Sequence, residues 1–179
     1  DQLPSAARFA FLPHPPHRSV GGVASSANGL MSQMEPVEVY DHPLPGRVKG
    51  RGVLVGRFGA GGDGLLVAVA HLSLGAQSRL AQLAFIAEVL SDAPHAVLMG
   101  DFNCLAHEPE MAVLYRHTRL QPPDHDVHTF PAWKPQRAID HVLATDSIRS
   151  TTRAAVPAAA SDHLALSVEL DVPEAALRR

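Results

Sequence analysis

The first half of the chain is rich in short segments whose apolar positions are typical of β-strands. Residues 28–32 form a short apolar run, and residues 37–40 alternate between apolar and polar side chains, the period of a half-buried strand. We expect these two strands to pair or to lie adjacent. The apolar, β-branched stretches 52–58 and 65–72 flank the glycine-rich segment 59–64, a pattern that predicts a β-hairpin.

A helical period replaces this pattern over residues 76–91. Apolar residues recur there at intervals of three and four, the spacing of one face of an α-helix. The face consists of Leu80, Leu83, Ala84, Ala87 and Leu90. The pattern predicts an amphipathic helix that buries one side against a sheet.

The rest of the chain continues this mixture of strands and helices. We expect an irregular lead-in over 1–26, strands over 95–99, 138–144 and 164–170, a second helix over 109–120 and a polar, proline-containing loop over 122–135. Strands interleaved with helices favour a layered α/β sandwich in which helices cover sheets. The length of 179 residues suits one globular core, so we expect a single domain over residues 1–179.

Composition narrows the class of protein without naming a substrate. The net charge of −3 gives no general basic field, so a nucleic-acid contact would need a local basic patch. The single cysteine, Cys104, excludes an internal disulfide, and no apolar stretch reaches the roughly 18 residues of a membrane span. No secretory leader pattern is seen at the N-terminus, and we expect a cytoplasmic protein.

A carboxylate and a carboxamide follow the apolar strand 95–99. In the run Gly100-Asp101-Phe102-Asn103, the side chains of Asp101 and Asn103 are two positions apart and would share one face of an extended segment. Asp101 could then orient or deprotonate an attacking water, and Asn103 could donate a hydrogen bond to a phosphoryl oxygen. The competing interpretation is a turn, because Gly, Asp and Asn are common turn residues.

Two further acids and a histidine lie beside later apolar strands. Asp162 and His163 immediately precede the strand at 164–170, a placement that suits a ligand for a hard metal ion beside a phosphate-binding imidazole. Asp140 could accept a hydrogen bond from the His163 ring and so define its tautomer. The alternative for Asp162 and His163 is a turn at the entrance to a strand.

His71 stands at the end of the stretch 65–72 and could donate a proton to a phosphate oxygen. The alternative is a structural histidine with its hydrogen bonds satisfied in the core.

Taken together, these segments resemble the endonuclease/exonuclease/phosphatase family. Four motifs carry the resemblance and occur in the family's order: His71-Leu72, Gly100-Asp101-Phe102-Asn103, Ile139-Asp140-His141-Val142 and Ser161-Asp162-His163. The family, which includes DNase I-like nucleases, has a four-layered α/β sandwich and uses Mg²⁺ or Mn²⁺. The resemblance covers residues 28–170 and implies an enzyme that hydrolyses phosphoester bonds.

The resemblance also implies roles for individual side chains. Asp101 would activate or align the nucleophilic water, Asn103 would bind the scissile phosphate, and His163 would stabilise the pentavalent phosphate. Asp140 would support His163. A divalent cation that neutralises phosphate charge is consistent with these roles.

The remaining implied roles concern the metal and the substrate. Asp162 would help to hold the metal, directly or through water, and His71 would bind phosphate from the opposite side. The segment Thr129-Phe130-Pro131-Ala132-Trp133 is similar to one that many bacterial members place beside the active-site mouth. Trp133 could stack on a base or cover a leaving group, or it could anchor the loop on the core.

The sequence departs from the family at its start. Members open with a strand that bears an asparagine and a second strand that bears a metal-binding glutamate, and neither is found before Asp1-Gln2. We therefore expect a sandwich that lacks its N-terminal strands, with Glu35 and Glu38 on a different strand from the missing ligand. Loss of a carboxylate ligand would weaken Mg²⁺ binding.

Three functions are compatible with these residues. The first is a metal-dependent phosphodiesterase, nuclease or phosphatase acting on a nucleic acid, a phospholipid head group or a sugar phosphate. The second is a catalytically silent fragment that acts by binding or assembly, and the third is a lipid or inositol phosphate phosphatase. The oligomeric state is not indicated by the sequence.

Overall fold

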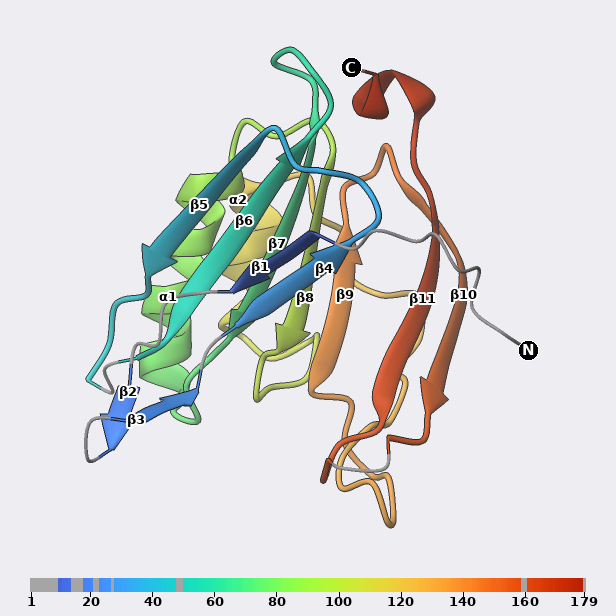
Figure 1. Ribbon diagram of the computed structural model, residues 1–179. Coiled ribbons are helices and arrows are strands. Elements are labelled where there is room, and N and C mark those ends of the chain that lie inside the picture. Colours follow the sequence, from blue (N-terminus) through green and yellow to red (C-terminus); the bar gives the residue numbers. More distant parts are fainter. Residues whose placement is uncertain are drawn as a thin grey trace.

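A five-stranded mixed β-sheet forms the centre of the protein (Figure 1). The computed structural model describes residues 10–13, 18–20, 23–26, 28–47, 50–158 and 161–178. The strand order is β5 (Glu38–Pro43), β6 (Gly52–Phe58), β7 (Leu65–His71), β8 (Ala96–Asp101) and β9 (Asp140–Ala144). Only the β7–β8 pair is parallel, and the other three pairs are antiparallel.

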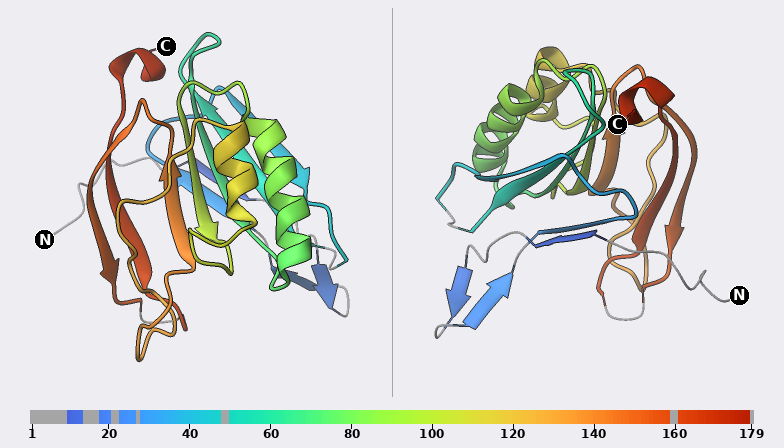
Figure 2. Two further views of the ribbon diagram at one scale, coloured as in Figure 1. Left: turned by 180° about the vertical axis from the view of Figure 1, so that it is seen from behind. Right: turned by 45° about the horizontal axis from the view of Figure 1, so that its top comes forward.

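Two α-helices cover one face of this sheet (Figure 2). Helix α1 (Ala76–Leu90) connects the parallel strands β7 and β8, and α2 (Met111–His117) packs beside it. Parallel neighbours require such a crossover connection, because a tight turn can join only antiparallel strands. The larger apolar core lies between the sheet and the helices and includes the fully buried Leu72, Leu83 and Phe102.

Smaller two-stranded sheets lie on the other side of the central sheet (Figures 1 and 2). They are formed by β1 (Ala10–Pro13) with β4 (Gly29–Ser32), β2 (Arg18–Val20) with β3 (Val23–Ser26), and β10 (Arg149–Val156) with β11 (Ala165–Asp171). A short 3-10 helix, η1 (Glu174–Leu177), follows β11. A second apolar cluster, which includes Leu54, Phe58 and Ala176, fills this side.

The predicted α/β sandwich is confirmed, as is the hairpin at residues 59–64, which joins the antiparallel strands β6 and β7. The second helix, α2, is shorter than the predicted 109–120.

The expected pairing of 28–32 with 37–40 is wrong, because β4 pairs with β1 whereas β5 pairs with β6. The segment 1–26, predicted to be irregular, contains the strands β1, β2 and β3 in its described parts. Residues 1–9, His14 and His17 lie outside the described residues.

Strand β10 was not predicted. Its segment, Arg-Ser-Thr-Thr-Arg-Ala-Ala-Val, has only a short apolar run at its end, and its residues are exposed or half-buried, with none fully buried. Strand β10 pairs with β11 alone, and such two-stranded sheets leave many polar side chains in water. The hydrophobic pattern of the sequence therefore carries little trace of it.

The buried face of α1 also differs from the expected stripe. Leu80 is 47% exposed, whereas Arg79 and Gln82 are buried together with Leu83, Ile86, Ala87 and Leu90. Two polar side chains thus occupy positions at which a helix of this kind normally presents apolar ones.

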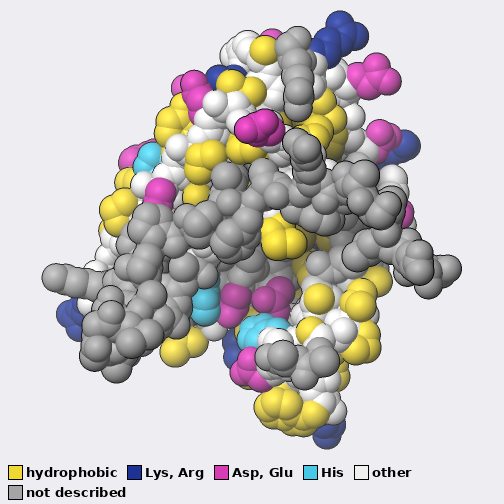
Figure 3. All heavy atoms as spheres, in the orientation of Figure 1, with side chains coloured by type: hydrophobic (Ala, Val, Ile, Leu, Met, Phe, Trp, Pro, Cys, Tyr) yellow, Lys and Arg dark blue, Asp and Glu magenta, His cyan; other side chains and the backbone are white. Residues whose placement is uncertain are grey.

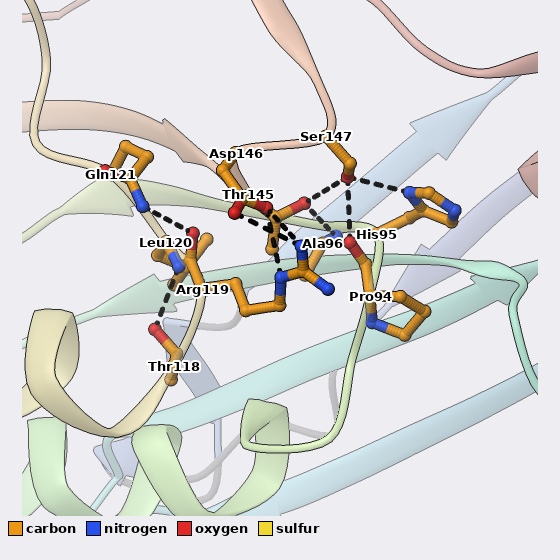
Figure 4. A network of polar contacts seen from close by, with 10 residues as sticks. All are labelled: Pro94, His95, Ala96, Thr118, Arg119, Leu120, Gln121, Thr145, Asp146 and Ser147. Atoms are coloured by element: carbon orange, nitrogen blue, oxygen red, sulfur yellow. Dashed lines mark hydrogen bonds and ion pairs between the residues drawn. The ribbon is translucent and has the colours of Figure 1, made fainter.

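A polar network joins β8 to β9 at the end of the sheet where β8 begins (Figure 4). The backbone N–H of Ala96 donates to Thr145 Oγ1 at 3.0 Å, and Ser147 Oγ donates to the carbonyl of Pro94 at 2.8 Å. His95 Nδ1 lies 2.8 Å from the same Ser147 hydroxyl. These contacts hold the entrance to β8 in register with β9, whose opposite end carries Asp140.

Among the described residues, no helix has the length and apolar character that a membrane crossing requires.

Candidate active site

Three predicted site residues lie in a row on neighbouring strands. His71 ends β7 and is paired in register with Asp101, which ends β8, and Asp101 is paired in turn with Asp140, which begins β9. Parallel strands β7 and β8 finish at the same edge of the sheet, and the antiparallel β9 starts there. The sheet register alone therefore brings these side chains together.

Asp101 contacts His71 and the turn that follows β8. Its Oδ2 lies 3.2 Å from His71 Nε2, and its Oδ1 accepts a hydrogen bond of 2.9 Å from the backbone N–H of Asn103. Burial acts to raise the pKa of the Asp101 carboxyl, but the hydrogen bonds from His71 and Asn103 outweigh it, so the pKa is lowered overall. Asp101 is consequently ionised at neutral pH.

The expected contact between Asp140 and His163 is present. Asp140 Oδ2 lies 2.7 Å from Nδ1 of His163 and also accepts a hydrogen bond of 2.5 Å from the Thr129 hydroxyl. Burial acts to lower the pKa of His163, but the hydrogen bond and charge of Asp140 prevail, so the pKa is raised. Because Asp140 occupies Nδ1, the Nε2 atom of His163 is the one available to a substrate or ion.

The side chains of Asp101, Asp140 and His163 could hold a metal ion. One ligand atom from each lies within 4.8 Å of the other two. Two partly buried carboxylates in register on adjacent strands repel each other, and a divalent cation between them would relieve that repulsion. Asp162 is exposed and is not in this group, although it immediately precedes His163.

Asn103 reaches the site by a turn, contrary to the expected extended segment. Its φ is +55°, in the left-handed region that Asn adopts more readily than most residues. The turn directs its Nδ2 to the carbonyl of Leu72, the residue after His71, at 2.9 Å. The turn interpretation is thus correct for the backbone, and the turn itself brings Asn103 to the strand end that bears His71.

His141, which follows Asp140 in the same motif, has a structural role. It is 4% exposed, its Nε2 lies 2.8 Å from the carbonyl oxygen of Cys104, and its ring meets that of Phe102 edge to face at 5.1 Å. Burial lowers the pKa of His141, which keeps the ring neutral.

A long loop borders the His163 side of the site. The centroids of the Phe130 and His163 rings are 4.7 Å apart. Two backbone hydrogen bonds join this loop to the segment before β11. The Ala132 N–H donates to the Asp162 carbonyl at 2.7 Å, and the Leu164 N–H donates to the Thr129 carbonyl at 2.8 Å. Trp133, from the same loop, is 77% exposed. It is therefore not an anchor buried in the core.

Several acidic and histidine side chains lie together just below the middle of the face shown in Figure 3. Next to Asp101 and Asp140 lies an open cavity of about 340 Å³. Its remaining lining is mostly apolar and comes from β4, β7, β8, β9, β11 and the residue before β11; it includes Val69, Met99, Val142, Leu164 and Leu166. The charged side chains of Asp101 and Asp140 thus lie beside an apolar pocket.

Comparison with known proteins identifies the relationship that this geometry suggests. The sequence profile of the endonuclease/exonuclease/phosphatase family matches residues 2–163, nearly the whole chain. The chain belongs to the endonuclease/exonuclease/phosphatase family. Comparison with curated proteins gave no significant match.

Solved structures share the fold of this family member at low sequence identity. A family protein from Bacteroides thetaiotaomicron has a TM-score of 0.73 and 16% identity, with 92% of this chain and 76% of that chain covered. A mannosyl-6-phosphatase from the same organism has a TM-score of 0.72 and 16% identity, covering 91% and 77%. D. rerio TDP2, solved with a single-strand DNA product, has a TM-score of 0.69 and 15% identity, covering 92% and 77%.

Sequence reasoning missed two contributors to the site, Thr129 and Phe130. Both were noted only as part of the segment that carries Trp133. A Thr-Phe-Pro run in a loop without a hydrophobic period has no feature that predicts a contact with Asp140 or His163. The only available signal was the resemblance of this segment to one beside the active-site mouth of relatives.

Proposed function

We propose that this chain hydrolyses phosphoester bonds by in-line attack of a water molecule, with Mg²⁺ or Mn²⁺ as cofactor, and that residues 1–179 act as one domain. The observation that supports it most strongly is the convergence of Asp101, Asp140 and His163 to within 4.8 Å, in a member of a phosphoesterase family. Carboxylates for a hard cation beside an imidazole for phosphate suit this reaction class.

Asp101 is the residue proposed to orient the water and to accept its proton. Its carboxylate is ionised, and its Oδ1 is held by the Asn103 N–H at 2.9 Å, so its direction is defined before substrate arrives. Water attacks phosphorus, the proton moves to the carboxylate, and the bond from phosphorus to the leaving oxygen breaks. Asn103 is proposed to bind the phosphoryl group and His71 to contact it from the other side.

His163 is proposed to stabilise the charge that develops on the pentavalent phosphate. Asp140 holds the ring through Nδ1 and raises its pKa, so that Nε2 presents a proton to a phosphoryl oxygen. Thr129 and Phe130 restrict the motion of this pair. Preorganised donors of this kind cost no reorganisation when the transition state forms.

The metal would be held by Asp101, Asp140 and the exposed Asp162, the last directly or through water. When bound, a divalent cation neutralises phosphate charge and polarises the bond that is cleaved. Oxygen ligands favour Mg²⁺ or Mn²⁺ over softer metals.

Several phosphoesters remain candidate substrates, namely a nucleic acid, a phospholipid head group or a sugar phosphate. A mannosyl-6-phosphatase and a DNA-bound TDP2 share this fold, so the fold accommodates more than one class. The exposed Trp133 is proposed to contact the group attached to the phosphate.

The test is a phosphoester panel assayed with Mg²⁺, with Mn²⁺ and with a chelator. We expect metal-dependent turnover that falls by about 10³-fold or more in Asp101→Ala and in His163→Ala, with both variants folded. Asp146→Ala is the matched control, because Asp146 is an exposed partner of Arg119. Saturable metal binding without turnover of any substrate would favour the alternative of a silent binding fragment, and turnover of inositol or lipid head groups alone would identify a lipid phosphatase.

A further inference from the structure

Gln82 is a fully buried polar residue on the face of α1 that packs against the sheet. Its Oε1 accepts a hydrogen bond of 2.9 Å from the backbone N–H of Ser73, and its Nε2 donates to the Ser73 hydroxyl and to the Pro45 carbonyl, both at 3.0 Å. The carboxamide therefore uses its acceptor and both of its donors. An apolar residue at this position could fill the space but could not make these contacts.

The segment that Gln82 holds is directly joined to the active site. Ser73 follows Leu72, whose N–H donates to the Asp101 carbonyl and whose carbonyl accepts the hydrogen bond from Asn103 Nδ2, each at 2.9 Å. A continuous chain of contacts thus runs from Gln82 through Ser73 and Leu72 to Asn103. Within this chain, the Leu72 carbonyl is the group that determines the direction of the Asn103 carboxamide.

A second buried polar residue of α1 holds the next residue of the same loop. Arg79 donates to the Leu74 carbonyl and, through Nε at 2.8 Å and a terminal nitrogen at 2.5 Å, to Glu110 Oε1. Glu110 immediately precedes α2 and is 7% exposed. The loop after β7 is therefore held by α1 at Ser73 and at Leu74, the two residues that follow Leu72, and the loop after Asn103 is fastened to the same helix through Glu110.

The buried polar contacts that hold this loop contribute little to the stability of the fold. Buried polar pairs add little to stability compared with apolar residues of the same shape, because their desolvation offsets most of the gain. They do specify one geometry, since a shifted loop would leave several buried polar groups unpaired. That property matters where a shift of about 1 Å can cost a large factor in rate.

We propose that Gln82 is a positioning residue, which acts through Ser73 and Leu72 to orient the Asn103 carboxamide toward the scissile phosphate. The proposal rests on the proposed function, in which Asn103 binds the phosphoryl group. Arg79 and Glu110 hold the surrounding loops and support the same geometry.

A double-mutant cycle between Gln82 and Asn103 tests the proposal. We expect Gln82→Leu to lower kcat by about tenfold or more with a smaller change in KM. In the Asn103→Ala background the same substitution should lower kcat by less than about threefold, because the residue through which it acts is gone. Gln77→Leu is the matched control, since Gln77 is exposed on the same helix and should leave kcat unchanged in both backgrounds.

A measurement independent of turnover accompanies the cycle. The side-chain NH₂ resonances of Asn103, assigned by their loss in Asn103→Ala, should shift in Gln82→Leu and stay in place in Gln77→Leu. If Gln82→Leu does not fold, Ser73→Ala takes its place in the cycle and in the NMR comparison, because it removes one of the three Gln82 contacts. Equal losses of kcat in both backgrounds, or unshifted Asn103 resonances, would overturn the proposal.

The outcomes also separate this proposal from the proposed function. An active protein whose turnover is reduced but measurable in Asn103→Ala, together with a Gln82 effect that is independent of Asn103, would overturn the positioning role alone. Absence of turnover on every phosphoester would overturn the proposed function and with it the positioning role of Gln82.

Discussion

Asp140 and His163, which are 23 residues apart in the sequence, share a hydrogen bond of 2.7 Å between Oδ2 and Nδ1. Asp140 begins β9, and His163 lies just before β11, so the bond connects the central sheet to the two-stranded sheet beside it. The imidazole is thereby held with Nδ1 bonded to the carboxylate, which leaves Nε2 as the nitrogen available to a substrate.

Replacing the Asp140 carboxylate should separate the effect of its charge from that of its shape. Asp140→Asn removes the negative charge that raises the pKa of His163, so that pKa should fall, and kcat should fall by about 10²- to 10⁴-fold because the tautomer is no longer defined. An NMR titration of His163 and steady-state kinetics are the measurements. The control is Asp146→Asn, at the exposed pair with Arg119, which should change neither the pKa of His163 nor kcat. If the pKa of His163 does not move in Asp140→Asn, Asp140 is not the residue that raises it.

The elements that could be predicted from the sequence are those in which burial imposes a period. Strands β6, β7 and β8 are apolar because both of their faces are covered, and α1 has its helical stripe because one side packs on the sheet. Strand β10 lacks such a pattern because its polar side chains face water. The hydrophobic pattern therefore predicts the elements that form the core, but it does not predict strands outside the core whose side chains face water.

The candidate site shows the same division. His71, Asp101 and Asp140 could be placed together because each ends or begins an apolar strand. Gln82 and Arg79 could not be recognised as buried residues that support the site, because the sequence pattern predicts that a polar side chain on a helix is exposed to solvent. Their partners lie mainly in loops, and Pro45 and Glu110 are 37 and 31 residues away in the sequence, although Ser73 is only nine residues from Gln82.

Metal binding should depend unequally on Asp101 and Asp162, two of the three acids proposed to hold the metal. Asp101→Ala removes a partly buried carboxylate from the group within 4.8 Å and should abolish the calorimetric signal for Mg²⁺ and Mn²⁺. Asp162→Ala removes an exposed carboxylate outside that group and should weaken binding by about tenfold, the effect of an indirect ligand. The ranking is the critical result: stronger loss in Asp162→Ala than in Asp101→Ala would show that the metal lies elsewhere.

The single cysteine should make the folded state sensitive to high pH. Burial raises the pKa of the Cys104 thiol to about 12, whereas an unfolded chain loses this proton near a pKa of about 8.5. Between these values the folded state binds more protons than the unfolded one, so the free energy of unfolding should decrease as pH rises, by at most about 1.4 kcal/mol per pH unit for this group. The stability is fully present below the unfolded pKa.

Urea titrations from pH 8 to pH 11 would measure this loss. Comparison with Cys104→Ala isolates the thiol, because Tyr115 and the other titrating groups are the same in both proteins. The variant should be less stable at pH 8, since it leaves a small cavity, and its free energy of unfolding should decline less steeply. Parallel declines in the two proteins would mean that the buried thiol does not set the slope.

Trp133 should affect substrate binding without affecting the fold. Its side chain is 77% exposed on the loop whose Phe130 packs against His163, so Trp133→Ala should change the free energy of unfolding by less than about 0.5 kcal/mol. If the ring contacts the group attached to phosphate, KM should rise by about tenfold or more for a substrate with an aromatic or apolar group there, and by much less for a small phosphoester. Trp133 is the only tryptophan in the chain, so its fluorescence reports binding directly. An unchanged KM and an unquenched signal with every active substrate would place this residue outside the binding site.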